Sequence, residues 1–345
     1  MDTPATQPTG IAASMAAALA AGYDPLAVHF YDLAHDGARI RSLAQQVADG
    51  EFNSLYNTHP RSVVILTDTL THRQAAQLAA ALREPHPLPI EIVEQLPEYV
   101  GPLDIVCLVS NSDTPQLIQA ARRAGEVSAQ LIIAAAGETM LALEPPRETV
   151  SVALPPTSST VTPVFVAAVV DTVLASIREE SALLAARLED WAQRVDDEIT
   201  ACSPDRDPLV NPACQLYAAI AQRWSLHTAT SHCGRSVAQL AATLCTDAGL
   251  AASFGDATVI ANNIAHLPAP ARDIFYDPEL DGDDQSHSLP QPIVIAWGDT
   301  KPPAAPITVR AETIDDQQLS RLDVACRLLI RLQAALIVGP PKTTR

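Results

Sequence analysis

The chain has 345 residues, of which 48% are hydrophobic and only 4% aromatic, so a core of Ala, Val, Leu and Ile is expected. This length suffices for a large core and for two domains. Asp and Glu number 40 against 22 Lys and Arg, and the net charge of -18 argues against nucleic acid or an anionic membrane surface as a partner.

The cysteines and the start of the chain indicate a cytoplasmic protein without a metal site. The six cysteines form no C-x-x-C pair and no zinc spacing with His, so we expect reduced thiols. The Ala-rich stretch 11–21 follows Asp2 and no Lys or Arg, which is unlike a secretory signal and is typical of an amphipathic helix. No run reaches the ~18 apolar residues that a membrane span needs.

In chain order, the first half alternates short apolar runs with helical patterns, which is typical of a parallel α/β sheet. The apolar runs are rich in β-branched residues and have the length of buried strands. We expect strands over 62–66, 90–93 at a sheet edge, 105–109, 131–136 and 149–154, and helices over 9–20, 36–47, 74–82, 116–125 and 161–177.

The clearest unit is the strand-helix-strand pattern of residues 103–137. Between its first strand and its helix lies a group of hydroxyl and turn residues, Ser110-Asn111-Ser112-Asp113-Thr114-Pro115. Backbone N–H groups at the start of a helix point outward unpaired, and the helix dipole favours an anion there. A phosphate would fit this loop, although a plain turn and helix N-cap would use the same residues. Gly125 suits the C-cap of the helix.

The strand, the Ser-x-Ser loop with a nearby Thr, the helix and the next strand resemble the phosphate loop of sugar isomerase (SIS) domains. Ser110, Ser112 and Thr114 match the Ser-x-Ser-Gly-x-Thr pattern of that family, with the Gly and one position missing. The two-domain length is similar to that of bifunctional phosphoglucose/phosphomannose isomerases. The resemblance implies a phosphate site at Ser110, Asn111, Ser112 and Thr114.

The end of the first strand departs from the family, in which a Gly-rich loop lets the backbone approach the sugar. This sequence has no Gly between Glu51 and Tyr99, so side chains at 68–71 would fill the space that glycines leave open. Thr67 and Thr69 could still offer hydroxyl groups to a substrate. An ordinary strand-to-helix connection is the alternative.

The second half repeats the same alternation after a charged helical stretch. We expect a connecting helix over 178–200 and a second domain from about residue 207, where Asn211-Pro212-Ala213 is similar to the start of the second SIS domain. Further strands are expected over 226–229 and 293–297, and helices over 237–245 and 315–338. The loop 230–234 keeps one glycine, Gly234. His232 and Arg235 could bring positive charge to a phosphate there, and the alternative is that both are ordinary surface residues.

The catalytic positions that the resemblance implies are occupied by other residues. An aldose–ketose isomerase needs a carboxylate base and an acid–base group such as His. Thr246 stands where the family has its Glu, and Asn262 where it has its His. Asp247 and His266 lie nearby as candidate catalytic residues, and the alternative is that one ends a helix and the other lies on the surface.

Two further features carry less weight. Lys342 is the only counterpart of the family's C-terminal Lys, and it lies in a Pro- and Thr-rich tail. The acidic stretch 277–288 has the early carboxylate spacing of a calcium loop but ends in Ser288, which favours a solvated surface loop. No dinucleotide, P-loop or G-x-S-x-G pattern is present in the sequence.

These patterns predict an α/β protein with two flavodoxin-like SIS domains, each a parallel sheet with helices on both faces. We expect domains over 1–178 and 207–345, joined by a helical linker over 179–206. The predicted function is phosphosugar binding, with isomerisation of glucose or mannose 6-phosphate and fructose 6-phosphate as one form and a catalytically inactive regulatory or partner protein as the alternative. We expect a homodimer and no cofactor.

Overall fold

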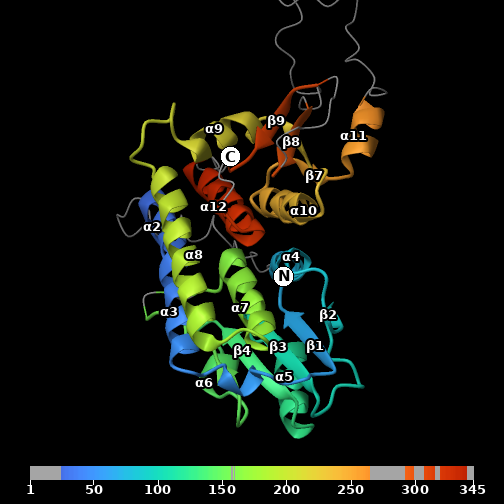
Figure 1. Cartoon of the computed structure of the whole chain (residues 1–345). Coiled ribbons are helices and arrows are strands. Elements are labelled where there is room, and N and C mark those ends of the chain that lie inside the picture. The colour runs from blue at the N-terminus through green and yellow to red at the C-terminus, as the bar shows by residue number, and fades with distance from the viewer. Residues whose placement is uncertain are drawn as a thin grey trace, which may run out of the picture.

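The structure is a computed structural model that describes residues 25–156, 158, 160–264, 292–298, 307–314 and 319–339. It contains two parallel sheets, with strand orders β2-β1-β3-β4-β5 and β7-β6-β8-β9 (Figure 1). The first is the flavodoxin order, and the predicted fold class is confirmed. The strands are β1 Ser62–Thr67, β2 Ile90–Val93, β3 Asp104–Ser110, β4 Gln130–Ala135, β5 Val150–Ser151, β6 Trp224–Thr228, β7 Ala252–Phe254, β8 Pro292–Trp297 and β9 Val309–Glu312.

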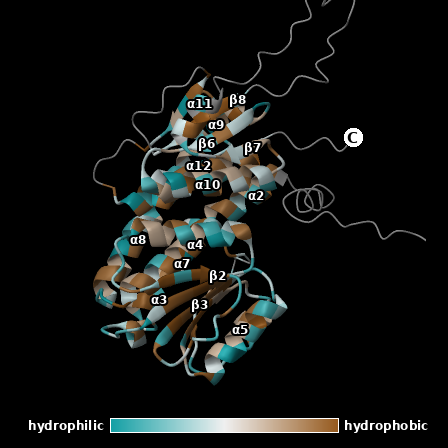
Figure 2. Cartoon of the chain, turned by 90° about the vertical axis from the view of Figure 1, so that its right-hand side faces the viewer, coloured by the Kyte–Doolittle hydropathy of each residue, from teal (hydrophilic) through white to brown (hydrophobic). Residues whose placement is uncertain are grey.

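Helices cover both faces of the first sheet. Alternate residues of β1, β3 and β4 point to opposite faces, as strand geometry requires. One set packs in the core that includes α4 and α7, and the other packs against α5 and α6. Figure 2 shows the central strands as hydrophobic and the outer side of α5 as largely hydrophilic. The helices are α2 Pro25–Ala34, α3 Asp36–Ala48, α4 Leu70–Leu82, α5 Pro115–Glu126, α6 Met140–Leu143, α7 Pro163–Ser176, α8 Ser181–Ala201, α9 Pro212–Ile220, α10 His232–Asp247, α11 Ala257–Ile264 and α12 Arg321–Val338.

Most predicted elements are present, with shifted ends that have local causes. The helix α4 starts at Leu70 rather than at 74 because the Thr69 side chain caps it. In the same way Ser231 caps α10, so that residues 232–234 are helical rather than loop. The expected C-cap at Gly125 is wrong, because α5 continues to Glu126. The strand expected over 149–154 has only two residues, α2, α6, α11, β7 and β9 were not predicted, and the helix expected over 9–20 lies outside the described residues.

The helix α8 has one buried face, although its charges suggested an exposed connection. It packs along α3 and also contacts α12. Its Glu198 is 1% exposed and accepts hydrogen bonds from Arg327 and Arg331 of α12, at 3.0 and 2.9 Å. Arg331 also reaches Glu312 at the end of β9. These paired charges join the connecting helix to the second sheet.

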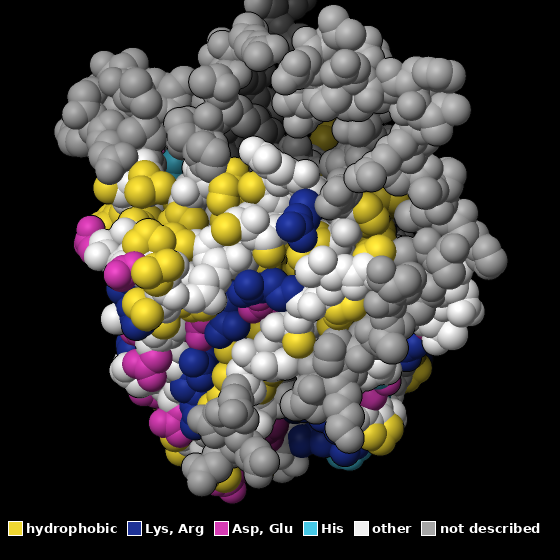
Figure 3. All heavy atoms as spheres, turned by 90° about the horizontal axis from the view of Figure 1, so that it is seen from above, with side chains coloured by type: hydrophobic (Ala, Val, Ile, Leu, Met, Phe, Trp, Pro, Cys, Tyr) yellow, Lys and Arg dark blue, Asp and Glu magenta, His cyan; other side chains and the backbone are white. Residues whose placement is uncertain are grey.

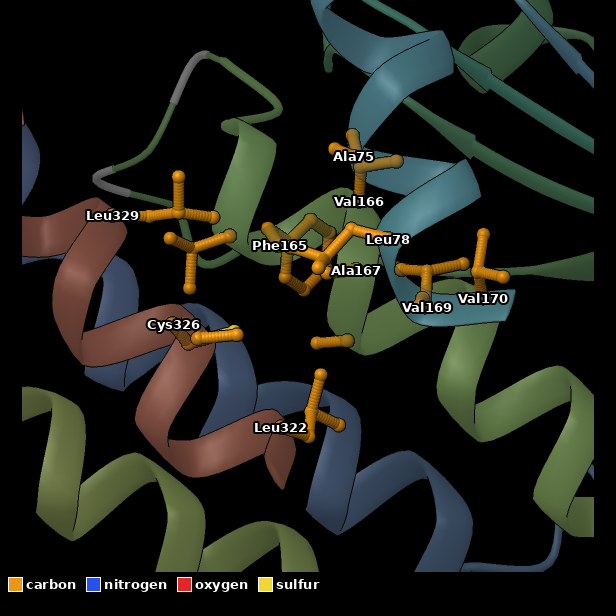
Figure 4. Close-up of a cluster of buried hydrophobic side chains, with 14 of the residues drawn as sticks. Ala75, Leu78, Phe165, Val166, Ala167, Val169, Val170, Leu322, Cys326 and Leu329 are labelled. Atoms are coloured by element: carbon orange, nitrogen blue, oxygen red, sulfur yellow. The ribbon is translucent and has the colours of Figure 1, made fainter. Parts of the chain in front are cut away.

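A single hydrophobic core joins the two halves. Nearly every residue of α7 is buried, as expected for a helix that is apolar on all sides. In Figure 4 its side chains Phe165 and Val166 lie between those of α4 and those of α12, such as Cys326. The helices α4 and α10 also pack together. The helix α4 is therefore held in place by packing against α7 of the first half and α10 of the second half.

One end of the molecule carries charges of both signs. On the end that carries α9 and β9, acidic and basic side chains lie close together among hydrophobic ones (Figure 3). None of the helices in the described part of the chain combines the length and the apolar character needed to cross a bilayer.

The second sheet contains a buried histidine. His227 of β6 is fully buried, and its Nδ1 accepts a hydrogen bond from Trp297 Nε1 at 2.9 Å. Its Nε2 lies 3.0 Å from Ser225 Oγ, so the neutral imidazole satisfies both partners. Burial lowers the pKa of His227 to about 3.

This histidine predicts a pH-dependent stability. The unfolded chain binds a proton at this position below its usual pKa of about 6.5, whereas the folded protein does not, so stability is complete above that pH and is lost as the pH falls. We expect a loss of about 1.4 kcal/mol in the free energy of unfolding between pH 7.5 and 5.5 from His227. The free energies of unfolding of the wild type and of His227→Gln, measured with urea at several pH values, should differ in how steeply they fall as the pH is lowered. Equal pH dependence in the two proteins would contradict it.

Candidate functional site

The candidate site lies at the carboxyl edge of the first sheet, where parallel α/β sheets bind their ligands. The neighbouring strands β1 and β3 end here in Thr67 and Ser110, and the helices α4 and α5 begin. The two connections, residues 67–70 and 110–115, therefore lie side by side. They hold six of the residues that the sequence singled out.

The hydroxyl groups of the second connection are used locally. Ser110 is buried, and its Oγ donates to the carbonyl of Ser112 and accepts from the Ser112 N–H at 3.0 Å. Thr114 is the N-cap of α5 and accepts from Leu117 N. Ser110 and Thr114 thus shape the turn and start the helix. The side chain of Ser112 points instead to the first connection.

The carboxylate of Asp68 receives the donors of this loop. Its Oδ2 accepts from Asn111 N at 2.8 Å and from Ser112 Oγ at 3.1 Å. Its Oδ1 lies 2.6 Å from His72 Nδ1, and the Asp68 side chain is 1% exposed. Burial alone would raise the pKa of Asp68, but His72 and the loop donors hold it below its ordinary value. An ionised carboxylate therefore occupies the loop at neutral pH.

A third segment, residues 158–161 just before α7, borders the site. The side-chain amide of Asn111 donates to the carbonyl of Val161 at 2.8 Å and accepts from its N–H at 2.6 Å. The Nε2 of His72 lies 3.1 Å from the same carbonyl. Further along this segment, the fully buried Arg39 donates to Ser158 Oγ. Asn111 and His72 are therefore held by Asp68 on one side and by the backbone of Val161 on the other.

The threonines at the end of β1 serve the backbone. The Thr67 hydroxyl lies 3.4 Å from the carbonyl of Thr69, and the Thr69 hydroxyl accepts from His72 N at 3.1 Å. This is the geometry of an ordinary strand-to-helix connection, which was the alternative interpretation of these residues.

The antiparallel pairing of α4 and α10 places the residues from the second half. Asp247, at the end of α10, accepts from Thr71 Oγ1 at 2.9 Å, next to the start of α4. The neighbouring Thr246 donates to the carbonyl of Ala242 in its own helix. The structure therefore brings Asp247 to the side of the candidate site, as an exposed residue.

The other candidates lie elsewhere. His232 is at the opposite end of α10, about 24 Å away along 16 residues of helix, and pairs with Glu84 at 3.3 Å. Arg235 is exposed on the same turn. Gly234 permits the close approach of this helix to β8, because a Cβ there would lie 2.5 Å from the carbonyl oxygen of Trp297. Asn262 is exposed on α11, and His266, Lys342 and the acidic stretch 277–288 lie outside the described residues.

Sequence reasoning missed His72 as a member of this site. Its helical spacing from Asp68 was visible, but nothing local indicates that its far nitrogen meets Val161. Within the described ranges no group of three or more His, Cys, Asp or Glu side chains is arranged to hold a metal ion. A groove of about 320 Å³ lies beside the site, between β4, β5 and α6, with Gly137, Pro156 and Ser158 in its lining.

Comparison with known proteins supports the fold alone. No protein-family model and no curated protein matches the sequence. Among solved structures, the chain is similar to tagatose-6-phosphate ketose/aldose isomerase from Escherichia coli, with 14% identity, 89% of this chain and 91% of that chain covered, and a TM-score of 0.58. It is also similar to the C-terminal domain of glucosamine-fructose-6-phosphate aminotransferase from Francisella tularensis, with 12% identity, 90% and 94% covered, and a TM-score of 0.53. The resemblance to SIS proteins is thus confirmed as a resemblance of fold.

The contacts of Asn111 predict a structural role for its side chain. Asn111→Ala removes two hydrogen bonds and leaves the Val161 backbone groups without these partners, so we expect a loss of about 2 kcal/mol in unfolding free energy. Ser112→Ala removes one bond of an exposed side chain and should cost less than about 1 kcal/mol. Urea unfolding measures both variants. Equal losses would show that the bonds to Val161 are not what fixes the loop.

Proposed function

We propose that this protein binds a sugar phosphate at the loop of residues 110–114 and does not isomerise it. It would then act as a regulatory or partner protein of sugar-phosphate metabolism. As a binding protein in the cytoplasm it would work as a homodimer and without a cofactor.

The observation that carries the proposal is the position of this loop. It lies at the carboxyl end of a central strand and at the start of α5, where a phosphate accepts bonds from outward-facing N–H groups. Asn111 N–H and the Ser112 hydroxyl both point to one place between β1 and β3. The similar structures are named for proteins of 6-phosphorylated sugars, which supports the same class of ligand here.

The second half supports binding without catalysis. Proton transfer between the carbons of a sugar needs a base within hydrogen-bond reach of the substrate. Thr246 has no carboxylate, and its hydroxyl is bonded within its own helix. Asp247 is exposed and engaged with Thr71, so it is neither buried nor directed freely at the loop.

An isomerase remains the second candidate because of that same contact. Thr71 lies three positions after Asp68, so the Asp247 carboxylate lies beside the site, one position after the residue that the resemblance aligns with the family's Glu. A substrate that drew Asp247 away from Thr71 would meet a carboxylate. In that case Asp247→Asn would abolish turnover.

Calorimetric titration with fructose 6-phosphate, glucose 6-phosphate and mannose 6-phosphate tests the proposal. We expect the wild type to bind at least one of them, and Ser112→Ala to bind it about tenfold more weakly because a direct donor is lost. Ser54→Ala is the matched control, since it also removes one hydrogen bond of an exposed serine, to Gln130, away from the loop. A coupled assay of sugar interconversion should stay at the blank rate. Absence of binding up to millimolar concentrations would contradict the proposal, and turnover would replace it by the isomerase.

A further inference from the structure

An acidic side chain already occupies the loop that the proposed function, on which this step rests, assigns to a phosphate. Three donors from two parts of the chain converge on Asp68: Asn111 N–H and the Ser112 hydroxyl from the loop after β3, and His72 Nδ1 from α4. Two oxygen atoms that accept three hydrogen bonds from this loop and helix occupy the place that the oxygen atoms of a phosphate group would take. We propose that the Asp68 carboxylate is an internal competitor that occupies the phosphate position and must move out before a sugar phosphate binds.

Like charge makes simultaneous occupation unfavourable. The Asp68 side chain is 1% exposed, so water does little to screen it. A phosphate dianion at the Asn111 N–H would lie within a few ångströms of this ionised carboxylate, and like charges so close cost several kcal/mol. The ligand and Asp68 therefore exclude each other.

The position of Asp68 in the chain lets it move without unfolding the sheet. Asp68 lies between β1 and α4 and belongs to neither, and the next residue, Thr69, caps α4 with its own side chain. Its turn away from the loop would break three side-chain bonds and leave the strand register of β1 with β3 unchanged. The movable group is thus a side chain and its short connection.

The partner left behind favours the ligand. The two ring nitrogens of His72 lie beside oxygen atoms, Nδ1 beside Asp68 Oδ1 and Nε2 beside the carbonyl of Val161. Its ring is held by the Val161 carbonyl and by its place in α4. When Asp68 leaves, the Nδ1 of His72 lies where it can donate a hydrogen bond to the phosphate.

With competition of this kind, the apparent affinity is the intrinsic affinity multiplied by the fraction of molecules in which Asp68 is displaced. Replacing Asp68 by a small neutral residue removes the competitor and keeps the donors of residues 111 and 112. The Asp68→Ser variant should bind fructose 6-phosphate at least tenfold more tightly than the wild type in calorimetric titration. Inorganic phosphate, used as a second probe, should show the same gain, because the competition concerns the phosphate group.

Asp113→Ser is the matched control. Asp113 lies in the same loop and carries the same charge, but its carboxylate accepts from Met140 N and Leu141 N of α6 and from none of the three donors. Removing it changes the local charge equally, so we expect less than a threefold gain. Asp68→Asn keeps the size of the side chain and replaces Asp68→Ser in the test if the serine variant does not fold. Its gain in affinity should lie between those of the wild type and Asp68→Ser.

The outcomes separate the two proposals. A gain in Asp68→Ser or Asp68→Asn but not in Asp113→Ser supports the internal competitor. Unchanged or weaker binding in both Asp68 variants, or an equal gain in Asp113→Ser, overturns the internal competitor. In that case wild-type binding that depends on Ser112 still supports the proposed function. Absence of binding in all four proteins overturns both.

Discussion

The hydrogen bonds of the Asp68 carboxylate connect the segments that meet at the carboxyl edge of the first sheet. One oxygen takes the N–H and hydroxyl donors of the loop after β3, and the other takes the ring nitrogen of His72 in the first turn of α4. Through His72 and Asn111 the same cluster reaches the backbone of Val161 ahead of α7. Donors that are shielded from water and lack an acceptor cost about 1–3 kcal/mol each, so this edge needs an acceptor, either the Asp68 carboxylate or a ligand.

The rest of the structure holds this edge in place. The helix α4 packs on α7 and α10 within a core that continues from one sheet to the other, so the start of α4 cannot shift independently. Its contact with α10 brings Asp247 to Thr71 and leaves His232 at the far end. The second half thus acts on the site mainly as a support.

Much of the fold was predictable because strands such as β1, β3 and β8 are short runs of buried apolar residues between turn residues. The strands β7 and β9, with the sequences Ala-Ser-Phe and Val-Arg-Ala-Glu, contain no run of large apolar residues that would indicate a strand. The absence of glycine after β1 correctly suggested that side chains fill the loop. The partners of the Asp68 side chain were not predictable, because Asn111 is 43 positions away in the chain and meets Asp68 only through the tertiary fold. The position of Asp247 likewise depends on how α4 and α10 pack.

The most direct test of this account is a crystal structure of the wild-type protein, from crystals grown in the presence of saturating fructose 6-phosphate. The account predicts the phosphate group at hydrogen-bond distance from Asn111 N–H and His72 Nδ1, with the Asp68 carboxylate turned out of the loop. A bound phosphate with Asp68 still accepting from Asn111 and Ser112 would contradict it, because ligand and carboxylate would then occupy different places.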